Sequence, residues 1–167
     1  MKSKIRHLDS VHSQLSHEIA NVAPELLSKR PAEDEWSVGE VIHHLLLVEE
    51  RVLDELKKGL EKPPQKIGLL KNLIPMRLVS WRFVRVSAPK AVMPAGFNNT
   101  HESMKTWDSC RSELKALCAT LDAKRLKQIA FRHPFLGDIN GLAAISMVAF
   151  HEERHYKQIK EILAKIE

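Results

Sequence analysis

The sequence of 167 residues contains no long apolar run, and nothing in it approaches the roughly 20 apolar residues that a membrane-spanning helix requires. The N-terminal segment also lacks the continuous apolar stretch of a secretory signal peptide. We therefore expect a cytoplasmic protein that does not cross a membrane.

Glycine, tyrosine and cysteine are scarce. Six glycines and one tyrosine, in a chain that is 44% hydrophobic and 28% charged, favour a helical globular protein over a β-sandwich or a disordered chain. The two cysteines, Cys110 and Cys118, lie about 12 Å apart along one predicted helix, which is too far for a disulfide. We expect reduced thiols. The length suits a single domain over residues 1–167 that buries a core without disulfide or metal staples.

Acidic residues are missing from one part of the chain. The net charge of +5 arises from 26 basic and 21 acidic residues, and residues 62–101 hold seven of the basic residues and no acidic one. A basic stretch can attract nucleic acid or an anionic ligand. Five prolines interrupt this stretch and leave no regular basic helix face, so the pattern disfavours nucleic acid as a partner.

Apolar residues recur at helical spacing along most of the chain. Residues 4–28 show this pattern and predict a first helix, which Pro31 ends. Ser37 and Glu40 have the spacing of a capping box, which predicts that a second helix begins at Ser37. Gly59, followed by two prolines, is expected to stop this helix.

Two further apolar stripes follow a long irregular segment. Residues 61–100 are the least regular part, in which residues 69–86 could form one or two short helices. A third stripe runs from Met104 to Leu121, and a fourth continues to the C-terminus after Asn140, a candidate helix cap. These features predict an all-α four-helix bundle with a long crossover between helices two and three. The cores of such bundles often hold metals through side chains of facing helices.

Two histidines of the last predicted helix suggest a metal site. His151 and His155 are four positions apart, so their side chains project from one helix face, one turn apart. They lie on the apolar stripe, where an imidazole without a partner is costly. A shared metal ion would provide that partner. The alternative is that both rings form hydrogen bonds at the rim of the bundle, since such a pair can arise by chance among nine histidines.

A third ligand is expected from His43 or His44 in the second helix. The two cannot both face the core, because adjacent residues of a helix point about 100° apart. His44 is flanked at helical spacing by Val41 and Val48, which favours it over His43 without excluding the latter. The other histidines have different expected places: His12 is buried and hydrogen-bonded, His133 lies in a loop, and His7, His17 and His101 lie at the surface or at helix ends.

Three neutral imidazoles favour Zn²⁺, Ni²⁺, Cu²⁺ or Fe²⁺ over Ca²⁺ and Mg²⁺. Three protein ligands also leave one coordination position open, as in catalytic sites. Residues 151–155 match the H-E-x-x-H pattern of zinc metalloproteases, in which Glu152 would be the general base. Those enzymes need a further ligand beyond the motif, and no histidine occurs among the twelve residues that follow. The protease interpretation is therefore disfavoured.

Three stretches of the chain resemble the DinB-like (DinB/YfiT) superfamily, and the match covers essentially the whole sequence. They are residues 30–45, 131–137 and 151–159. Members of this family are four-helix bundles, often dimeric, with a three-histidine metal site. One histidine belongs to a W-S-x-x-E-x-x-x-H-L pattern and two to an H-x-x-x-H pattern. In this sequence the patterns fall on His44, His151 and His155.

The resemblance also implies a chemistry. Characterised relatives include S-transferases and isomerases that use bacillithiol, mycothiol or glutathione, while many members have no known activity. We therefore expect a metal-dependent thiol S-transferase, or a related hydrolase or isomerase. Its expected cofactors are Zn²⁺ or Ni²⁺ and a low-molecular-weight thiol, its substrate an electrophile, and its assembly a homodimer. The basic residues 62–101 would either lie near the mouth of the site or form a solvated connector in which Trp81 and Phe83 cap the core. The alternative is a non-catalytic metal-binding stress or scaffold protein.

Overall fold

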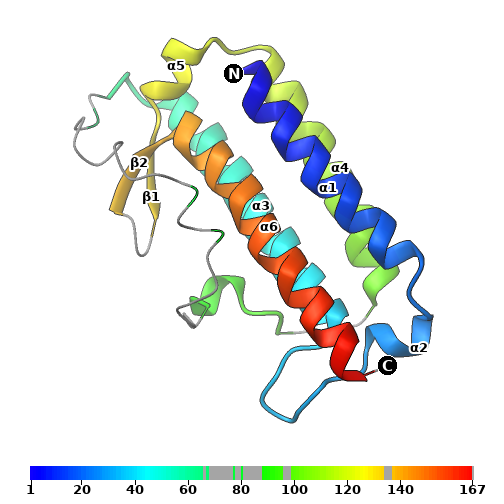
Figure 1. The fold of residues 1–167 in the computed structure, drawn as a ribbon. Coiled ribbons are helices and arrows are strands. Elements are labelled where there is room, and N and C mark those ends of the chain that lie inside the picture. The colour runs from blue at the N-terminus through cyan, green and yellow to red at the C-terminus, as the bar shows by residue number, and fades with distance from the viewer. Residues whose placement is uncertain are drawn as a thin grey trace.

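Four long helices lie side by side and form the bundle in Figure 1. The computed structural model describes residues 1–65, 67, 77, 80, 88–95, 99–133 and 137–166. The long helices are α1 (Lys2–Ala20), α3 (Val38–Glu61), α4 (Thr100–Ala119) and α6 (Gly141–Ile166). The short elements are α2 (Pro24–Leu27), the 3₁₀ helix η3 (Lys90–Val92), α5 (Ala123–Lys127), β1 (Ala130–His133) and β2 (Gly137–Asn140). The predicted all-α four-helix bundle is confirmed, with one small hairpin added.

The helices are arranged as two parallel pairs. Helices α3 and α4 run in the same direction, because His43 meets Ser103 near their starts and Lys57 meets Glu113 near their ends. Helices α1 and α6 are also parallel, and α6 runs opposite to α3. The end of α3 and the start of α4 therefore lie at opposite ends of the bundle (Figure 1). The short helices predicted within residues 69–86 fall outside the described residues, apart from Arg77 and Ser80.

The predicted starts of the second and the last long helix are confirmed by their capping contacts. The Ser37 side chain accepts a hydrogen bond from the Glu40 N–H at 3.2 Å, and the Ser37 N–H donates to the Glu40 carboxylate at 2.8 Å. The Asn140 side-chain oxygen accepts a hydrogen bond from the Ala143 N–H at 2.8 Å, at the start of α6. The starting points of the two helices that carry the candidate ligands are thus set by local sequence.

The predicted end of the first helix at Pro31 is wrong. Helix α1 ends at Ala20, and Pro24 begins the separate short helix α2. Proline has no N–H to continue a helix but fits its first turn, where no such donor is needed. Pro24 therefore belongs to the start of a new helix and interrupts the apolar stripe that predicts a single one.

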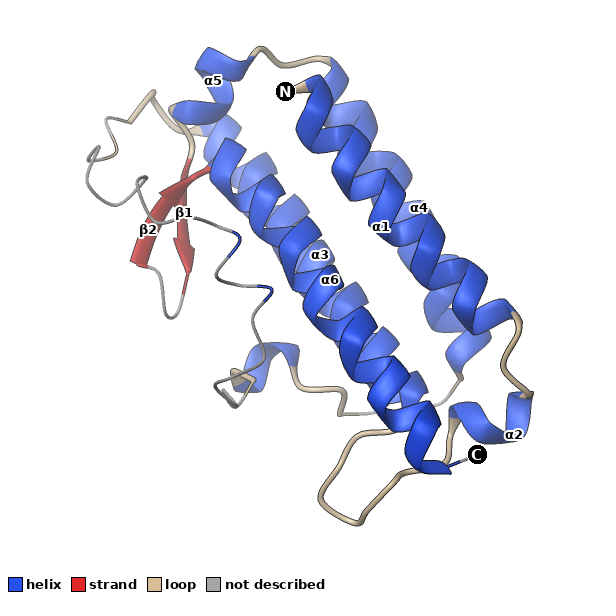
Figure 2. Cartoon of the chain, viewed as in Figure 1, coloured by secondary structure: helices blue, strands red, loops and turns tan. Residues whose placement is uncertain are grey.

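Gly59 and His133 also differ from the prediction. Gly59 lies inside α3, which continues to Glu61, so this glycine does not end the helix. A Cβ atom at position 59 would lie 2.3 Å from the Cγ2 methyl of Ile129, so glycine is needed here for close packing. His133 lies in β1, which pairs antiparallel with β2, and not in a loop. This hairpin lies beside the bundle near α5 (Figure 2).

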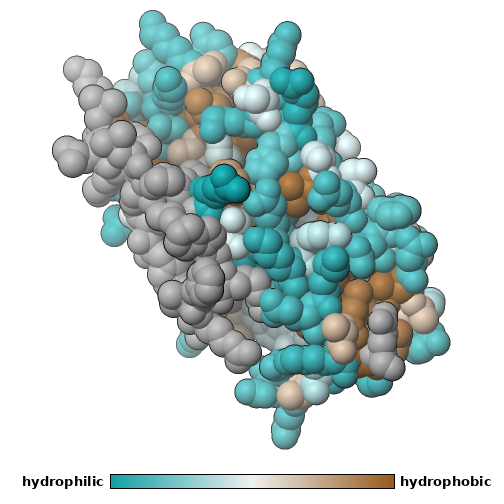
Figure 3. Space-filling view, in the orientation of Figure 1, coloured by the Kyte–Doolittle hydropathy of each residue, from teal (hydrophilic) through white to brown (hydrophobic). Residues whose placement is uncertain are grey.

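Outside the residues drawn in grey, the surface visible in Figure 3 is mostly hydrophilic, with hydrophobic areas near α2 and the end of α6 and near α5. Among the described residues, Met93 is a large hydrophobic residue that is exposed, at 44%. None of the helices in the described part of the chain has the length and hydropathy that a bilayer span requires.

A buried network of charged side chains joins α3, α4 and α6. The Arg111 guanidinium donates to both carboxylate oxygens of Glu49, at 2.6 and 2.7 Å, and to the carboxylate of Glu152. It also donates to the Leu8 carbonyl of α1 at 3.1 Å, so this α4 side chain contacts each of the other three long helices. Trp107 donates to Glu49 at 2.6 Å. Glu49 is thus a salt-bridging residue that is fully buried.

We predict that Arg111→Leu lowers the free energy of unfolding by about 3–5 kcal/mol, because it leaves two carboxylates buried without their cation. Glu49 and Glu152 are only 0% and 1% exposed, so water cannot replace the lost partner. Urea denaturation followed by circular dichroism measures the change. The matched control is Lys57→Leu, which removes an exposed ion pair between α3 and α4 and should cost less than about 1 kcal/mol. Equal, small losses in both variants would contradict the prediction.

Candidate metal centre

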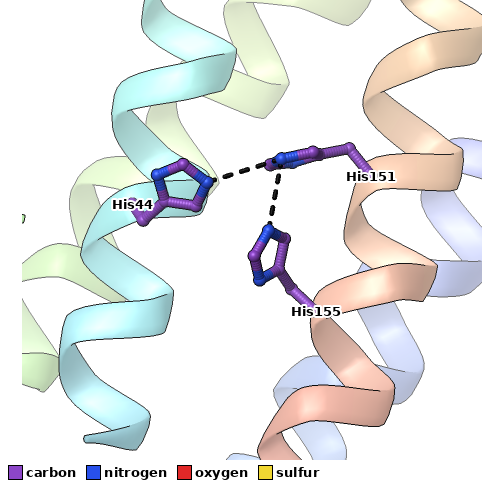
Figure 4. A group of neighbouring side chains, drawn as sticks. All are labelled: His44, His151 and His155. Atoms are coloured by element: carbon purple, nitrogen blue, oxygen red, sulfur yellow. Dashed lines mark hydrogen bonds between the residues drawn. The ribbon is translucent and has the colours of Figure 1, made fainter. Parts of the chain in front are cut away.

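Three histidine side chains from α3 and α6 point toward one another (Figure 4). The Nε2 atom of His44 lies 3.4 Å from that of His151, which in turn lies 3.2 Å from that of His155. The potential ligand atoms of all three lie within 4.8 Å of one another. Among the residues that the structure describes, this is the one group of histidine, cysteine and acidic side chains with such a geometry.

The spacing of the nitrogen atoms suits a tetrahedral metal site. Bonds of about 2.0–2.1 Å from a zinc ion to imidazole nitrogen place two ligands of a tetrahedron about 3.3–3.4 Å apart. The two Nε2 separations of 3.4 and 3.2 Å agree with this value. The side chains therefore fit a divalent ion with little movement. That they bind one stays a prediction.

The structure also decides between the two neighbouring histidines of α3. His44 is 4% exposed and faces α6, whereas His43 is half-buried and its ring contacts the Ser103 hydroxyl of α4 at 3.2 Å. The helical spacing that favours His44 over His43 in the sequence therefore predicts the orientation of the His44 side chain correctly. The Trp36 ring packs against the His44 ring with centroids 5.1 Å apart, next to the cap that starts the helix.

Two of the three rings are oriented by hydrogen bonds on the side away from the group. The His44 Nδ1 lies 2.6 Å from the carbonyl oxygen of Val92 in η3. A carbonyl can only accept, so Nδ1 carries the proton and Nε2 presents its lone pair to the other rings. The His155 Nδ1 lies 2.8 Å from the Gln158 side-chain oxygen, so an acceptor lies behind this ring as well. The His151 Nδ1 is buried and has no hydrogen-bond partner among the described residues.

All three imidazoles are held in the neutral form that binds metals. Burial lowers the pKa of His44, and it lowers the pKa values of His151 and His155 well below the ordinary value. The neighbouring imidazoles and the positive charge of Arg154 lower the last two further. Because a metal ion competes with protons for these nitrogens, neutral rings at pH 7 are ready ligands.

Glu152, the glutamate of the H-E-x-x-H pattern, does not face the histidines. Its carboxylate lies in the buried network with Arg111. Burial raises the pKa of Glu152 well above its ordinary value, although the Arg111 charge opposes this. A general base must reach the reacting water, and Glu152 is turned toward the core. The geometry thus agrees with the rejection of a metalloprotease.

The two cysteines are free, as expected, and neither belongs to the histidine group. Burial raises the pKa of the Cys110 thiol to about 12 and that of the Cys118 thiol to about 11. Both thiols are therefore protonated at neutral pH and are poor nucleophiles.

The remaining histidines lie outside the group. His12 is largely buried and contacts Asp108 at 2.8 Å, as expected. His7 is less exposed than expected, with one third of its side chain accessible and a contact of 2.6 Å to Glu153. Two others are exposed, as expected: His17 and His101.

Sequence reasoning missed two partners of the candidate ligands. Gln158 follows His155 by one helical turn, a spacing at which side chains meet, and this signal was available. The Val92 carbonyl gives no signal, because any residue offers the same backbone oxygen and only the fold brings it to His44.

Comparison with known proteins places the chain among helical relatives. YuaE of Bacillus subtilis (strain 168), described as an uncharacterized protein, is 28% identical over 152 residues, which cover 90% of this chain and 91% of YuaE. Two solved structures share the fold. TT2238, a four-helix bundle protein, gives a TM-score of 0.64 at 20% identity and covers 96% of this chain and 98% of its own.

The second structure is YfiT of Bacillus subtilis, described as a probable metal-dependent hydrolase with an unusual four-helix bundle topology. It gives a TM-score of 0.69 at 18% identity and covers 99% of this chain and 86% of YfiT. The sequence pattern of the DinB superfamily matches residues 7–159. Because this match spans most of the sequence, the chain belongs to the DinB superfamily.

Proposed function

We propose that this protein is a metal-dependent enzyme that holds a divalent ion, Zn²⁺ or Ni²⁺, on the Nε2 atoms of His44, His151 and His155. We further propose that it transfers a low-molecular-weight thiol to an electrophile. The observation that carries the proposal is the convergence of three neutral imidazoles at the ligand spacing of a tetrahedral ion. An ion held there supplies a Lewis acid, near which an external thiol or water is more easily deprotonated.

The arrangement of the three rings supports an open site. His44 and His155 are 4% and 7% exposed, whereas His151 is of intermediate exposure, so we propose that a substrate approaches the group on the side of His151. Neutral ligands also leave the full charge of the ion uncompensated. A fourth position that is reachable and positively charged favours an anionic ligand such as a thiolate.

The basic segment of residues 62–101 supports an anionic substrate. Val92 belongs to this segment, and its carbonyl contacts His44, so the segment reaches the site at this point. Seven basic residues and no acidic one would attract the carboxylates of a thiol cofactor. The basic residues lie mostly outside the described part of the chain, and their place near the mouth of the site is part of the proposal.

The state of the cysteines favours a thiol supplied from outside. The protein's own thiols are buried and protonated, and they stand apart from the histidine group. A thiol reaction at this site therefore needs a separate thiol molecule. The description of YfiT as a probable metal-dependent hydrolase supports the related possibility that water takes the place of the thiol. The proposal is completed by a homodimer, as the family resemblance implies, and by a cytoplasmic location, as expected from the sequence.

We predict that the purified protein binds one divalent ion per chain, and that His44→Ala weakens Zn²⁺ binding by more than about 100-fold. The reason is that the variant removes the one ligand that α3 contributes. Competition with a chromophoric chelator measures the affinity. The matched control is His43→Ala, which removes the adjacent imidazole that faces α4 and should change the affinity by less than about threefold. Equal losses in both variants would argue against the assigned site.

We predict thiol-dependent conjugation of an electrophile by the metal-loaded protein. Bacillithiol, mycothiol and glutathione are tested separately with 1-chloro-2,4-dinitrobenzene, from which the thiolate sulfur displaces chloride while the thiol proton passes to solvent. Chelation or His44→Ala should abolish the enzymatic rate. A Cys110→Ala, Cys118→Ala double variant should keep it, because these thiols are buried and protonated.

A second assay separates the transferase from its alternatives. Hydrolysis of p-nitrophenyl acetate without any thiol, lost with His44→Ala, would replace the transferase by a hydrolase. Metal binding without either activity would support the non-catalytic scaffold instead.

A further inference from the structure

Gln158 contacts His155, one of the three candidate ligands, through its side-chain amide. Gln158 follows His155 by one turn of α6, and its side-chain oxygen lies 2.8 Å from the His155 Nδ1. The corresponding contact of His44 is made by a backbone carbonyl, which no substitution removes. Gln158 is thus a side chain through which the orientation of a candidate ligand can be changed by mutation.

The position of the ring proton decides whether His155 can bind a metal. A neutral imidazole carries one proton, on Nδ1 or on Nε2, and only the form with the proton on Nδ1 offers an Nε2 lone pair. The His155 Nε2 lies 3.2 Å from the His151 Nε2, so a proton on His155 Nε2 would find an acceptor there. Without an acceptor at Nδ1, this competing form would be stabilised and the ligand atom would be blocked.

We propose that Gln158 is a positioning residue for the metal centre, which keeps the proton of His155 on Nδ1 and the ring turned toward His44 and His151. The inference rests on the proposed function, in which these three histidines hold the ion. Hydrogen-bond acceptors behind metal-binding histidines fix the form and the orientation of the ring and raise its basicity, and their loss typically weakens metal binding about 10–100-fold.

The proposal commits to the direction of this hydrogen bond. With the Gln158 oxygen facing the ring, His155 donates and its Nε2 is free to bind. With the amide rotated by half a turn, its NH₂ would donate to Nδ1, the ring proton would move to Nε2, and Gln158 would oppose metal binding. The two arrangements make opposite predictions for the ring proton and for the effect of removing the side chain.

The first measurement is the ring form of His155 in metal-free protein at pH 7.5, from the ¹⁵N shifts and two-bond couplings of labelled histidine. We expect the wild type to carry the proton on Nδ1, and Gln158→Leu to show a mixture or the proton on Nε2. Gln158→Glu keeps an acceptor and should keep the wild-type form. A proton on Nε2 in the wild type, or an unchanged form in Gln158→Leu, would overturn the inference.

The second measurement is the affinity for Zn²⁺, from competition with a chromophoric chelator. We expect Gln158→Leu to weaken it about 10–100-fold and Gln158→Glu to restore it to within about threefold of wild type. Gln158→Met serves in place of the leucine variant if that variant does not fold. The matched control is Tyr156→Phe, which removes a 3.0 Å hydrogen bond from α6 to Glu18 of α1 and should leave the affinity unchanged.

The outcomes separate this inference from the proposed function. Absence of metal from the wild type would overturn the proposed function, and the role of Gln158 in metal binding with it. Tight binding by wild type together with equally tight binding by Gln158→Leu would overturn the role of Gln158 alone. A loss in Gln158→Glu as large as that in Gln158→Leu would also overturn it, because the acceptor would then be irrelevant.

Discussion

The guanidinium of Arg111 lies between two buried carboxylates and links α3 to α6, the two helices that carry the three histidines. Glu49 lies on α3, just over one turn after His44, and Glu152 lies on α6, next to His151. Because Arg111 bonds to both, sliding one helix along the other would break charge-assisted hydrogen bonds where no water can replace them. The spacing of the imidazoles therefore depends on an interaction in which none of them takes part.

This arrangement also explains how one short stretch of α6 serves two purposes. Adjacent residues of a helix point about 100° apart, so His151 faces its neighbouring imidazoles while Glu152 faces the core and Arg111. A sequence pattern that matches H-E-x-x-H thus has a different meaning in this fold. Its two histidines are candidate ligands, and its glutamate is part of the structural network.

Much of the architecture could be predicted because it depends on local sequence patterns. The capping box at Ser37, the apolar stripes and the i,i+4 pair in the last helix depend only on residues close in sequence. The break at Pro24 could also have been predicted from proline chemistry, but the continuous apolar stripe outweighed it. Contacts between residues that are distant in the sequence could not be predicted from such local patterns. Neither the position of Arg111 beside Glu49 nor the approach of Gly59 to Ile129 has a spacing in the sequence that would reveal it.

The hydrogen bond between the Val92 carbonyl and His44 links η3 to the candidate metal centre. A cation at the Nε2 of His44 would draw electron density from the ring and make its Nδ1–H a stronger donor to that carbonyl. Thermodynamic linkage is reciprocal. If a bound ion strengthened the hydrogen bond between His44 and the Val92 carbonyl, that hydrogen bond would favour ion binding by the same free energy. If the proposed ion binds, its occupancy and the contact of η3 with α3 would therefore be coupled through one hydrogen bond.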